Sequence, residues 1–156
     1  MDFSKFDQQV DTAKLAADAA EAAQNGGGYA AIPKGEYTVG VDKLEIGETK
    51  DGRPMLKGQF RILEGAHTKA CLFYNRVLFG TKNDAGMIGA AISFLKSLEA
   101  QDEDGHPIQV DFQSYSQFND LVMDIAEAIE ADGLEYVVEY DEKAFNNIII
   151  KEVLEA

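Results

Sequence analysis

The chain has few of the residues that stabilise secreted proteins or span membranes. Among its 156 residues it has one cysteine, Cys71, which excludes an internal disulfide and is typical of a protein in a reducing compartment. No apolar run approaches the roughly 20 residues that a membrane-spanning helix needs. The N-terminus also lacks the basic start and the apolar stretch of a secretory signal. The sequence therefore predicts a soluble, cytoplasmic protein that does not associate with membranes.

Catalytic and metal-binding patterns are equally scarce. The two histidines, His67 and His106, lie in turn-like segments, and Cys71 pairs with neither at the spacing of metal ligands. Asp102-Glu103-Asp104-Gly105 lacks the spaced ligands and the distal glutamate of a calcium loop. Neither a glycine-rich phosphate motif ending in Lys-Ser or Lys-Thr nor a Gly-x-Ser-x-Gly element occurs. We therefore expect a non-enzymatic protein without a cofactor or a bound metal.

Positive charge is scarce too, and it is concentrated in one range. The chain has 14 basic and 28 acidic residues, a net charge of −14. Residues 34–82 nevertheless hold nine basic and six acidic residues, a net charge of +3, whereas the remainder holds five basic and 22 acidic residues. This range is also the most strand-like, and it contains the aromatic residues Tyr37, Phe60, Phe73, Tyr74 and Phe79. A basic sheet with aromatic side chains is typical of a surface that binds a nucleic-acid strand without reading its sequence.

The N-terminal region predicts a helical arm. Residues 4–24 have a thin apolar stripe at helical spacing, and Asn25-Gly26-Gly27-Gly28 ends the helix as a flexible hinge. An alanine-rich stripe buries little area, so we expect this arm to contact a second copy of the chain in a homo-oligomer. The chain is thus divided into an arm with its hinge, residues 1–28, and a single folded domain, residues 29–156.

Five strands and two helices are predicted after the hinge. The strands are expected at 36–46, 54–63, 70–79, 134–140 and 145–153, and the helices at 85–98 and 116–131. A bulge is expected near Gly40, and a tight turn at 50–53 joins the first two strands, with Gly52 supplying a positive φ. The order of three strands, two helices and two strands is close to a five-stranded Greek-key barrel of the OB type, with the second helix as an insertion. The predicted fold class is therefore mainly β with α (α+β), an OB-like barrel with two helices and an N-terminal helical arm.

The alternation of the second strand predicts a binding face. It places Lys57, Gln59 and Arg61 opposite an apolar set that includes Phe60. If the third strand lays Tyr74 and Arg76 alongside, cations would flank an aromatic platform that stacks bases. The candidate nucleic-acid-binding residues are Lys43, Arg53, Lys57, Gln59, Arg61, Tyr74, Arg76 and Lys82. The alternative is that this is only the solvated outer face of an alternating strand.

A pattern of turn and core residues spans most of the chain. It comprises Asn25-Gly26-Gly27-Gly28, Ile32-Pro33-x-Gly35-x-Tyr37-x-Val39, Gly52-Arg53-Pro54-Met55-Leu56, Phe60-x-Ile62-Leu63-Glu64-Gly65, Phe73-x-Asn75, Tyr140, Phe145-Asn146 and the strand 148–153. This pattern resembles a phage and prophage family long catalogued as a domain of unknown function, whose members are often labelled single-stranded-DNA-binding proteins and lie among replication and recombination genes. The resemblance implies an oligonucleotide-binding barrel that covers single-stranded DNA in the host bacterium's cytoplasm, with a phage recombinase or replication proteins as partners. It assigns no contact residues, because the shared residues are mainly structural.

The 22 acidic residues outside the basic range favour a second hypothesis. They would suit an acidic protein-interaction module that mimics nucleic acid or binds a host protein. Asp120, Asp124, Glu127 and Glu130 recur at helical spacing and would form a row of negative charge. A solvated helix face gives the same pattern, so both interpretations stand beside single-stranded-DNA binding.

Overall fold

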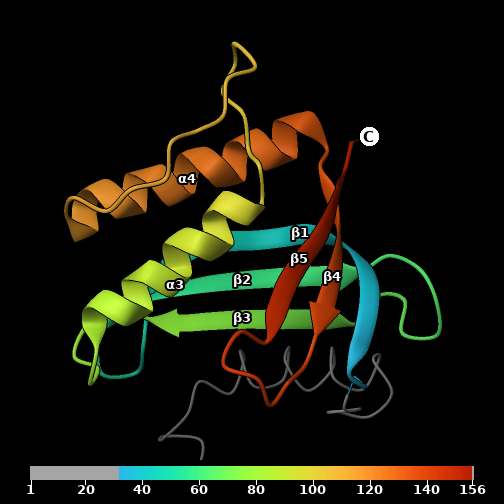
Figure 1. The fold of residues 1–156 in the computed structure, drawn as a ribbon, viewed down its shortest axis with the longest axis horizontal. Coiled ribbons are helices and arrows are strands. Elements are labelled where there is room, and N and C mark those ends of the chain that lie inside the picture. The colour runs from blue at the N-terminus through green and yellow to red at the C-terminus, as the bar shows by residue number, and fades with distance from the viewer. Residues whose placement is uncertain (1–31, 156) are drawn as a thin grey trace, which may run out of the picture. The chain divides into compact units, whose positions relative to one another are not determined.

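The computed structural model describes residues 32–155. The predicted arm, and the homo-oligomer contact assigned to it, lie outside the described residues. The described chain forms, in order, β1 (Gly35–Glu48), β2 (Pro54–Ile62), β3 (Cys71–Val77), α3 (Asp84–Ser97), α4 (Tyr115–Asp132), β4 (Glu135–Tyr140) and β5 (Ile148–Leu154) (Figure 1). This order confirms the predicted sequence of three strands, two helices and two strands.

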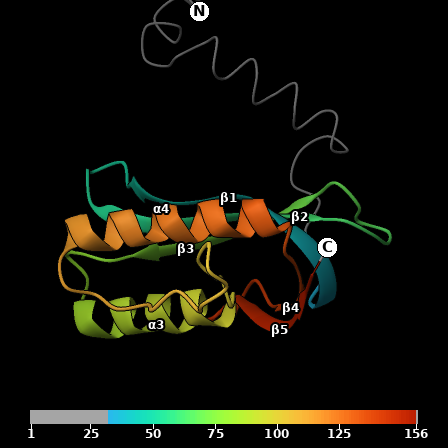
Figure 2. The ribbon, with the colours of Figure 1, turned by 90° about the horizontal axis from the view of Figure 1, so that it is seen from above.

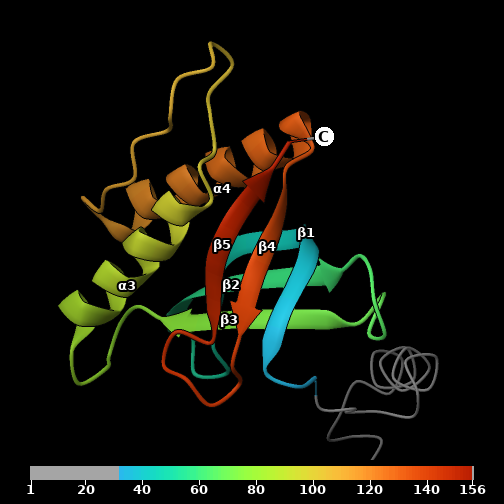
Figure 3. The ribbon, with the colours of Figure 1, turned by 45° about the vertical axis from the view of Figure 1, so that its right-hand side comes forward.

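All five strands belong to one antiparallel sheet in the order β3-β2-β1-β4-β5. The long strand β1 connects the two halves, because it pairs with β4 through Gly35–Gly40 and with β2 through Val39–Glu48. The register with β2 shifts between Val41 and Lys43, close to the predicted bulge. In Figures 1 and 3, β4 and β5 run alongside the first part of β1 and cross the direction of β2 and β3 steeply.

The sheet is open, with β3 and β5 as its two edges. The α+β class is thus confirmed, whereas the expectation of a closed barrel is wrong. The reason is the position of α3, which contacts both β3 and β5. Figure 2 shows β1–β3 as one layer, α3 with β4 and β5 as the opposite layer, and α4 in front of the β1–β3 layer, where it contacts β1. Among the described helices, none has the length and apolar character needed to cross a membrane.

The helices begin and end at residues that satisfy their free backbone groups. The Asn83 side chain accepts a hydrogen bond from the Gly86 N–H at 3.0 Å before α3, and Ser114 Oγ accepts one from the Gln117 N–H at 3.1 Å before α4. Gly133 ends α4 at φ 63°, the left-handed conformation that glycine adopts without strain. These local signals explain why both helices lie within two residues of their predicted bounds.

The core fills the space between the layers. Its largest fully buried side chains are Tyr74, Tyr136, Phe60, Phe118, Leu56, Ile62, Leu72, Leu78, Leu95, Leu98, Ile125 and Ile148. Phe94 of α3 joins the sheet to the helix, because its ring stacks on Tyr74 at 4.0 Å between centroids and meets the edge of Phe60 at 5.9 Å. On β4, the Tyr136 hydroxyl donates to the Leu98 carbonyl at 2.7 Å. The core therefore fixes which faces of β2 and β3 point to solvent.

Candidate functional site

The outward face of β2 carries three of the predicted binding residues. Lys57, Gln59 and Arg61 alternate with buried residues and stand half-buried on the outer side of the sheet, as predicted. The alkyl chain of Lys57 lies over Gly47 of β1, where an added Cβ would come within 2.9 Å of the lysine Cδ. In the part of the chain that the structure describes, Lys57 forms no ion pair with a carboxylate. Its ammonium is therefore available to a phosphate.

Two other predicted cations on this face are bound by carboxylates. The Arg61 guanidinium contacts Asp42 at 2.7 Å and also donates to the Lys69 carbonyl at 3.1 Å. Lys43 pairs with Glu45 of its own strand at 3.2 Å. Both pairs are largely solvent-exposed, so each is weak and can exchange a carboxylate for another anion. Lys43 and Arg61 thus contribute less positive potential than the sequence predicts.

Tyr74 and Arg76 point into the protein, so their predicted place on the outward face is wrong. Tyr74 is 1% exposed and Arg76 is 4% exposed. Leu72, Tyr74 and Arg76 share one face of β3, and that face is the inner one. Tyr74 lies opposite Gly58 of β2. Because glycine has no side chain, there is room for the Tyr74 ring beside Phe94. Burial raises the pKa of the Tyr74 hydroxyl, against the opposing effect of the nearby Arg76.

Arg76 instead connects β3 to the turn between β4 and β5. Its NH2 group donates to the Phe145 carbonyl at 2.9 Å and to the Asn146 side-chain oxygen at 3.1 Å, and its Nε donates to the Tyr74 hydroxyl at 3.3 Å. A buried guanidinium with these partners keeps its hydrogen bonds without a carboxylate. Arg76 is therefore part of the framework of the site.

The outward face of β3 exposes residues that the sequence analysis did not select. Phe73 is 53% exposed and pairs in register with Gln59, while the exposed Asn75 pairs with Lys57. Directly opposed residues on one face of an antiparallel pair lie about 5 Å apart at Cβ. An aromatic ring, two amides and an ammonium thus share one surface, which we call the β2–β3 face: Lys57, Gln59, Phe73 and Asn75. No sequence signal separates Phe73 from Tyr74, because both faces of β3 are equally apolar.

The two remaining predicted residues lie at the end of this face where β2 begins and β3 ends. Arg53, in the turn after β1, donates to the Gly80 carbonyl at 3.3 Å and pairs with Asp51 at 3.0 Å. Lys82 is exposed in the loop between β3 and α3, and within residues 32–155 it forms no ion pair. The structure thus brings Arg53 near the loop that contains Lys82.

Carboxylates with lowered pKa values at this end belong to the turns. Hydrogen bonds from Thr49 and then Arg53 lower the pKa of Asp51. Hydrogen bonds from Thr81 lower the pKa of Asp84, whose oxygens accept from the Thr81 N–H at 2.8 Å and the Gly80 N–H at 3.2 Å. Both shifts follow from donors that favour the charged carboxylate. Asp51 binds side chains of its own turn, whereas Asp84 holds the loop backbone at Gly80 and Thr81.

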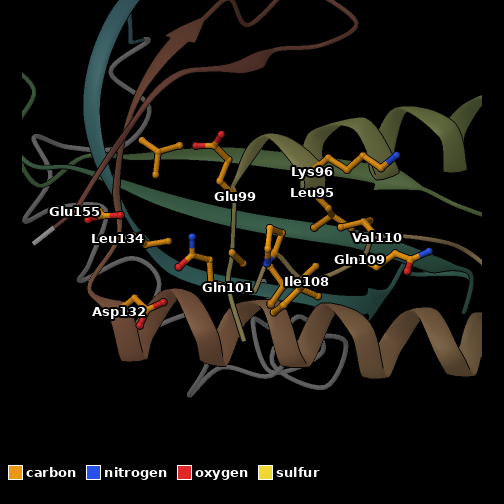
Figure 4. A pocket seen from close by; sticks show the side chains of 14 residues that line it. Leu95, Lys96, Glu99, Gln101, Ile108, Gln109, Val110, Asp132, Leu134 and Glu155 are labelled. Carbon is orange, nitrogen blue, oxygen red and sulfur yellow. The ribbon is translucent and has the colours of Figure 1, made fainter. Parts of the chain in front are cut away.

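A separate groove of about 800 Å³ lies between the C-terminal ends of α3 and α4 and the loop after α3. Figure 4 shows Glu99, Asp132 and Glu155 at one end, Lys96 and Gln109 at the other, and Ile108 between them. Its lining thus mixes acidic, basic, amide and apolar groups. None of the predicted binding residues lines it.

Asp102, Asp104 and His106 are the one group of possible metal ligands among the described residues. All three are exposed, and the Asp102 carboxylate accepts hydrogen bonds from the backbone N–H groups of Asp104 and His106 at 3.0 and 2.9 Å. The arrangement is that of an aspartate closing its own turn, with Gly105 at φ 79°. It therefore has a structural explanation in the turn itself.

The fold and the β2–β3 face define a small α+β protein whose open antiparallel sheet presents a polar and aromatic outer surface. Residues 17–146 match the family described as "Protein of unknown function (DUF669)", and the chain belongs to this family. No curated protein matches the sequence. Because the family description assigns no activity, the function has to be argued from the geometry of the site.

Proposed function

We propose that the protein is a non-enzymatic single-stranded-DNA-binding protein that binds in a sequence-tolerant way through the β2–β3 face. The observation that carries the proposal is the exposure of Phe73 beside Gln59 and beside Lys57, which forms no ion pair with a carboxylate of residues 32–155. Base stacking on an aromatic ring contributes about 1–3 kcal/mol per base whatever the sequence, and lysine contacts phosphate as a point charge. The side-chain amides of Gln59 and Asn75 add donors and acceptors for sugar or phosphate oxygens.

The topology supports this proposal through an OB-like interpretation of the sheet. In OB folds, the face formed by the second and third strands binds oligonucleotides together with the loop between strands one and two and the loop between strands four and five. Here the corresponding loops carry Lys50 and Arg53 on one side and Lys143 and Phe145 on the other. We regard the sheet as such a barrel opened between β3 and β5, with α3 in the opening.

The proposed biological setting is phage replication or recombination, with a phage recombinase or replication proteins as partners in the bacterial cytoplasm. The resemblance of the turn and core residues supports this setting. The net charge of −14 supports a binder that releases DNA readily, because the acidic remainder repels phosphates.

A fluorescence-anisotropy titration with labelled oligo-dT tests the proposal. We expect binding that weakens as salt rises above about 0.1 M, with a log–log slope of about −0.7 per neutralised phosphate, and weaker binding to duplex of the same length. Lys57→Gln should lower the affinity for oligo-dT and reduce the magnitude of the slope by roughly one phosphate contact. The matched control is Lys96→Gln, which removes a lysine from the groove on α3 and should leave the affinity unchanged.

Two results would contradict the proposal. One is the absence of oligo-dT binding by the full chain even at low salt. The other is an equal loss of affinity in Lys57→Gln and Lys96→Gln, which would show a diffuse charge effect in place of a defined surface.

A second candidate function has its own observation on α4. Asp120, Asp124, Glu127 and Glu130 are all exposed, and α4 contains no basic residue. This row of charge favours an acidic module that binds the basic surface of a protein. The test is a pull-down of a basic host protein with wild type and with an Asp124→Asn/Glu127→Gln variant. Retention lost in the variant, while oligo-dT affinity is unchanged, supports this function; equal retention rejects it.

A further inference from the structure

The turn between β4 and β5, residues 141–147, is fastened to the edge of β3. Arg76 donates to the Phe145 carbonyl and the Asn146 side chain, and the Asn147 amide donates to the Phe73 carbonyl at 2.8 Å. Figure 3 shows this turn beside β3, below the crossing of the two halves of the sheet. The turn also closes on itself, because the Asp141 N–H donates to the Asn147 carbonyl at 2.9 Å. The turn is therefore held both by its own backbone hydrogen bond and by its hydrogen bonds to β3.

The Phe145 ring is held in place on one side and open on the other. The Arg76 guanidinium carbon lies 3.9 Å from the ring centroid, so the planar guanidinium covers one face of the ring. Phe145 is nevertheless 63% exposed, more than any other large apolar residue in the described chain. Because Arg76 is itself 4% exposed and hydrogen-bonded, the ring rests on a buried and rigid support.

We propose that Phe145 is a stacking platform for one unpaired base, with Arg76 as the positioning residue that supports it. This inference rests on the proposed single-stranded-DNA function and extends the site beyond the β2–β3 face. A ring ordered before the ligand arrives loses little conformational entropy on binding, so most of the stacking energy remains available. A mobile exposed phenylalanine on an untethered turn would lack this advantage.

The position of the platform also sets the course of the bound strand. The Phe73 carbonyl is tied to Asn147, two residues from Phe145, so the two aromatic residues flank one stretch of the β3 edge. A single strand that contacts both residues passes from the β2–β3 face over this edge to the turn. Successive bases can then stack on rings supplied by two different parts of the sheet.

The experiment uses the absence of tryptophan from the chain. Phe145→Trp provides a single tryptophan at the platform, and Met123→Trp provides a matched control on the outer face of α4, where Met123 is 50% exposed. Labelled oligo-dT and an abasic oligomer of equal length report binding by anisotropy while tryptophan emission reports stacking. We expect oligo-dT to quench the emission of Phe145→Trp and to leave that of Met123→Trp unchanged. The abasic oligomer should bind Phe145→Trp without quenching its emission.

Affinity provides a second measurement on the same platform. Phe145→Leu keeps an apolar side chain but removes the ring, and it should weaken oligo-dT binding roughly 5- to 150-fold, the equivalent of one stacked base. The affinity for the abasic oligomer should stay unchanged. Because Phe145 is exposed, the substitution leaves the core intact.

Arg76 is tested in the Phe145→Trp background. Arg76→Met should increase the mobility of the introduced indole ring, measured as a lower tryptophan anisotropy in the free protein, with unchanged far-ultraviolet circular dichroism. If Arg76→Met does not fold, Asn147→Ala, which releases the turn from the Phe73 carbonyl, provides the same measurement. An indole anisotropy that stays the same in the folded variant would overturn the positioning role.

The outcomes separate the two proposals. Oligo-dT binding without quenching in Phe145→Trp, and with unchanged affinity in Phe145→Leu, overturns the platform while single-stranded-DNA binding stands. No oligo-dT binding by wild type overturns both.

Discussion

Gly58 shows at the level of single residues how closely β2 and β3 are packed. It is buried in β2 opposite Tyr74, and a Cβ added there would lie 2.8 Å from the Phe60 ring and 3.5 Å from the Tyr74 Cβ. Glycine is required at this position because the Phe60 and Tyr74 side chains fill the space that a Cβ would occupy. The inward orientation of Tyr74 therefore depends on a neighbour without a side chain.

We predict that Gly58→Ala lowers the free energy of unfolding by about 1–3 kcal/mol, the usual cost of overpacking a core. Gly89→Ala on α3 is the matched control, because a Cβ at Gly89 meets nothing within 4 Å. It should stabilise the protein by roughly 0.5–1 kcal/mol, since alanine is the better helix former. Chemical denaturation of both variants gives the two values. Equal effects of the two substitutions would contradict the packing described around Tyr74.

Single residues also mark the limit of what the sequence predicts about the site. Lys57, Gln59 and Arg61 could be placed outward because β2 alternates between clearly polar and clearly apolar residues. The strand β3 alternates between two apolar sets, so its pattern identifies the two faces but not which one is inside. Gly58 leaves room for Tyr74 on the inner face. This effect can be recognised only when the register between β2 and β3 is known.

At the level of elements, the loop before α3 is held by one carboxylate. Asp84 is the first residue of α3 and accepts hydrogen bonds from the Gly80 and Thr81 N–H groups. Hydrogen bonds from the Thr81 hydroxyl, and then from the Thr81 and Gly80 N–H groups, lower its pKa below the usual 3.8, so the folded state binds its proton less readily than the unfolded chain does. The stability that Asp84 contributes is therefore present above pH 3.8 and lost as the pH falls through the lower folded-state pKa.

We predict that Asp84→Asn lowers the stability at pH 7 and makes the acid unfolding curve less steep below about pH 4. The reason is that asparagine keeps the shape of the side chain but has no proton to release. Thermal unfolding of wild type and variant between about pH 2 and pH 7 measures both effects. A variant whose stability differs from wild type by the same amount at every pH would refute the role of the charged carboxylate.

Most elements could be predicted because they are specified locally. Caps at Asn83, Ser114 and Gly133 and the turn at Gly52, with φ 81°, determine where the helices and the first hairpin begin or end. The last strand begins three residues later than predicted because residues 141–147 form the turn fastened to β3. That turn depends on Arg76, 70 positions before Asn146 in the chain. Contacts at such separation leave no periodic signal in a sequence.

At the scale of the whole molecule, two regions of opposite charge would act on the strand in the proposed complex with a nucleic acid. The β2–β3 face and its loops supply cations, while α4 and most of the chain supply the negative charge of a protein with net charge −14. The range over which each charge acts depends on salt. The screening length is about 10 Å at 0.1 M ionic strength and about 30 Å at 0.01 M. At low salt, acidic residues far from the β2–β3 face would therefore also repel a phosphate bound there.

We predict that the affinity for oligo-dT rises as salt falls toward about 0.1 M and then levels off or declines toward about 0.01 M, because repulsion by the whole molecule is no longer screened. Anisotropy titrations over this range measure the curve. The control is a variant with Asp120, Asp124, Glu127 and Glu130 changed to the corresponding amides, whose affinity should continue to rise further. A straight log–log line down to about 0.01 M for wild type would contradict the predicted balance of charges.

The β4–β5 turn is hydrogen-bonded to β3, and we call this contact the seam of the sheet. Neighbouring strands of the sheet are joined by ladders of backbone hydrogen bonds, which separate only when the protein unfolds. Across the seam, by contrast, the hydrogen bonds described come from the side chains of Arg76 and Asn147. Substituting Asn147, which lies in the turn and in none of the strands, can therefore change how widely β3 and β5 part. The width of this opening is a property that can vary from one sequence to another while the architecture stays constant.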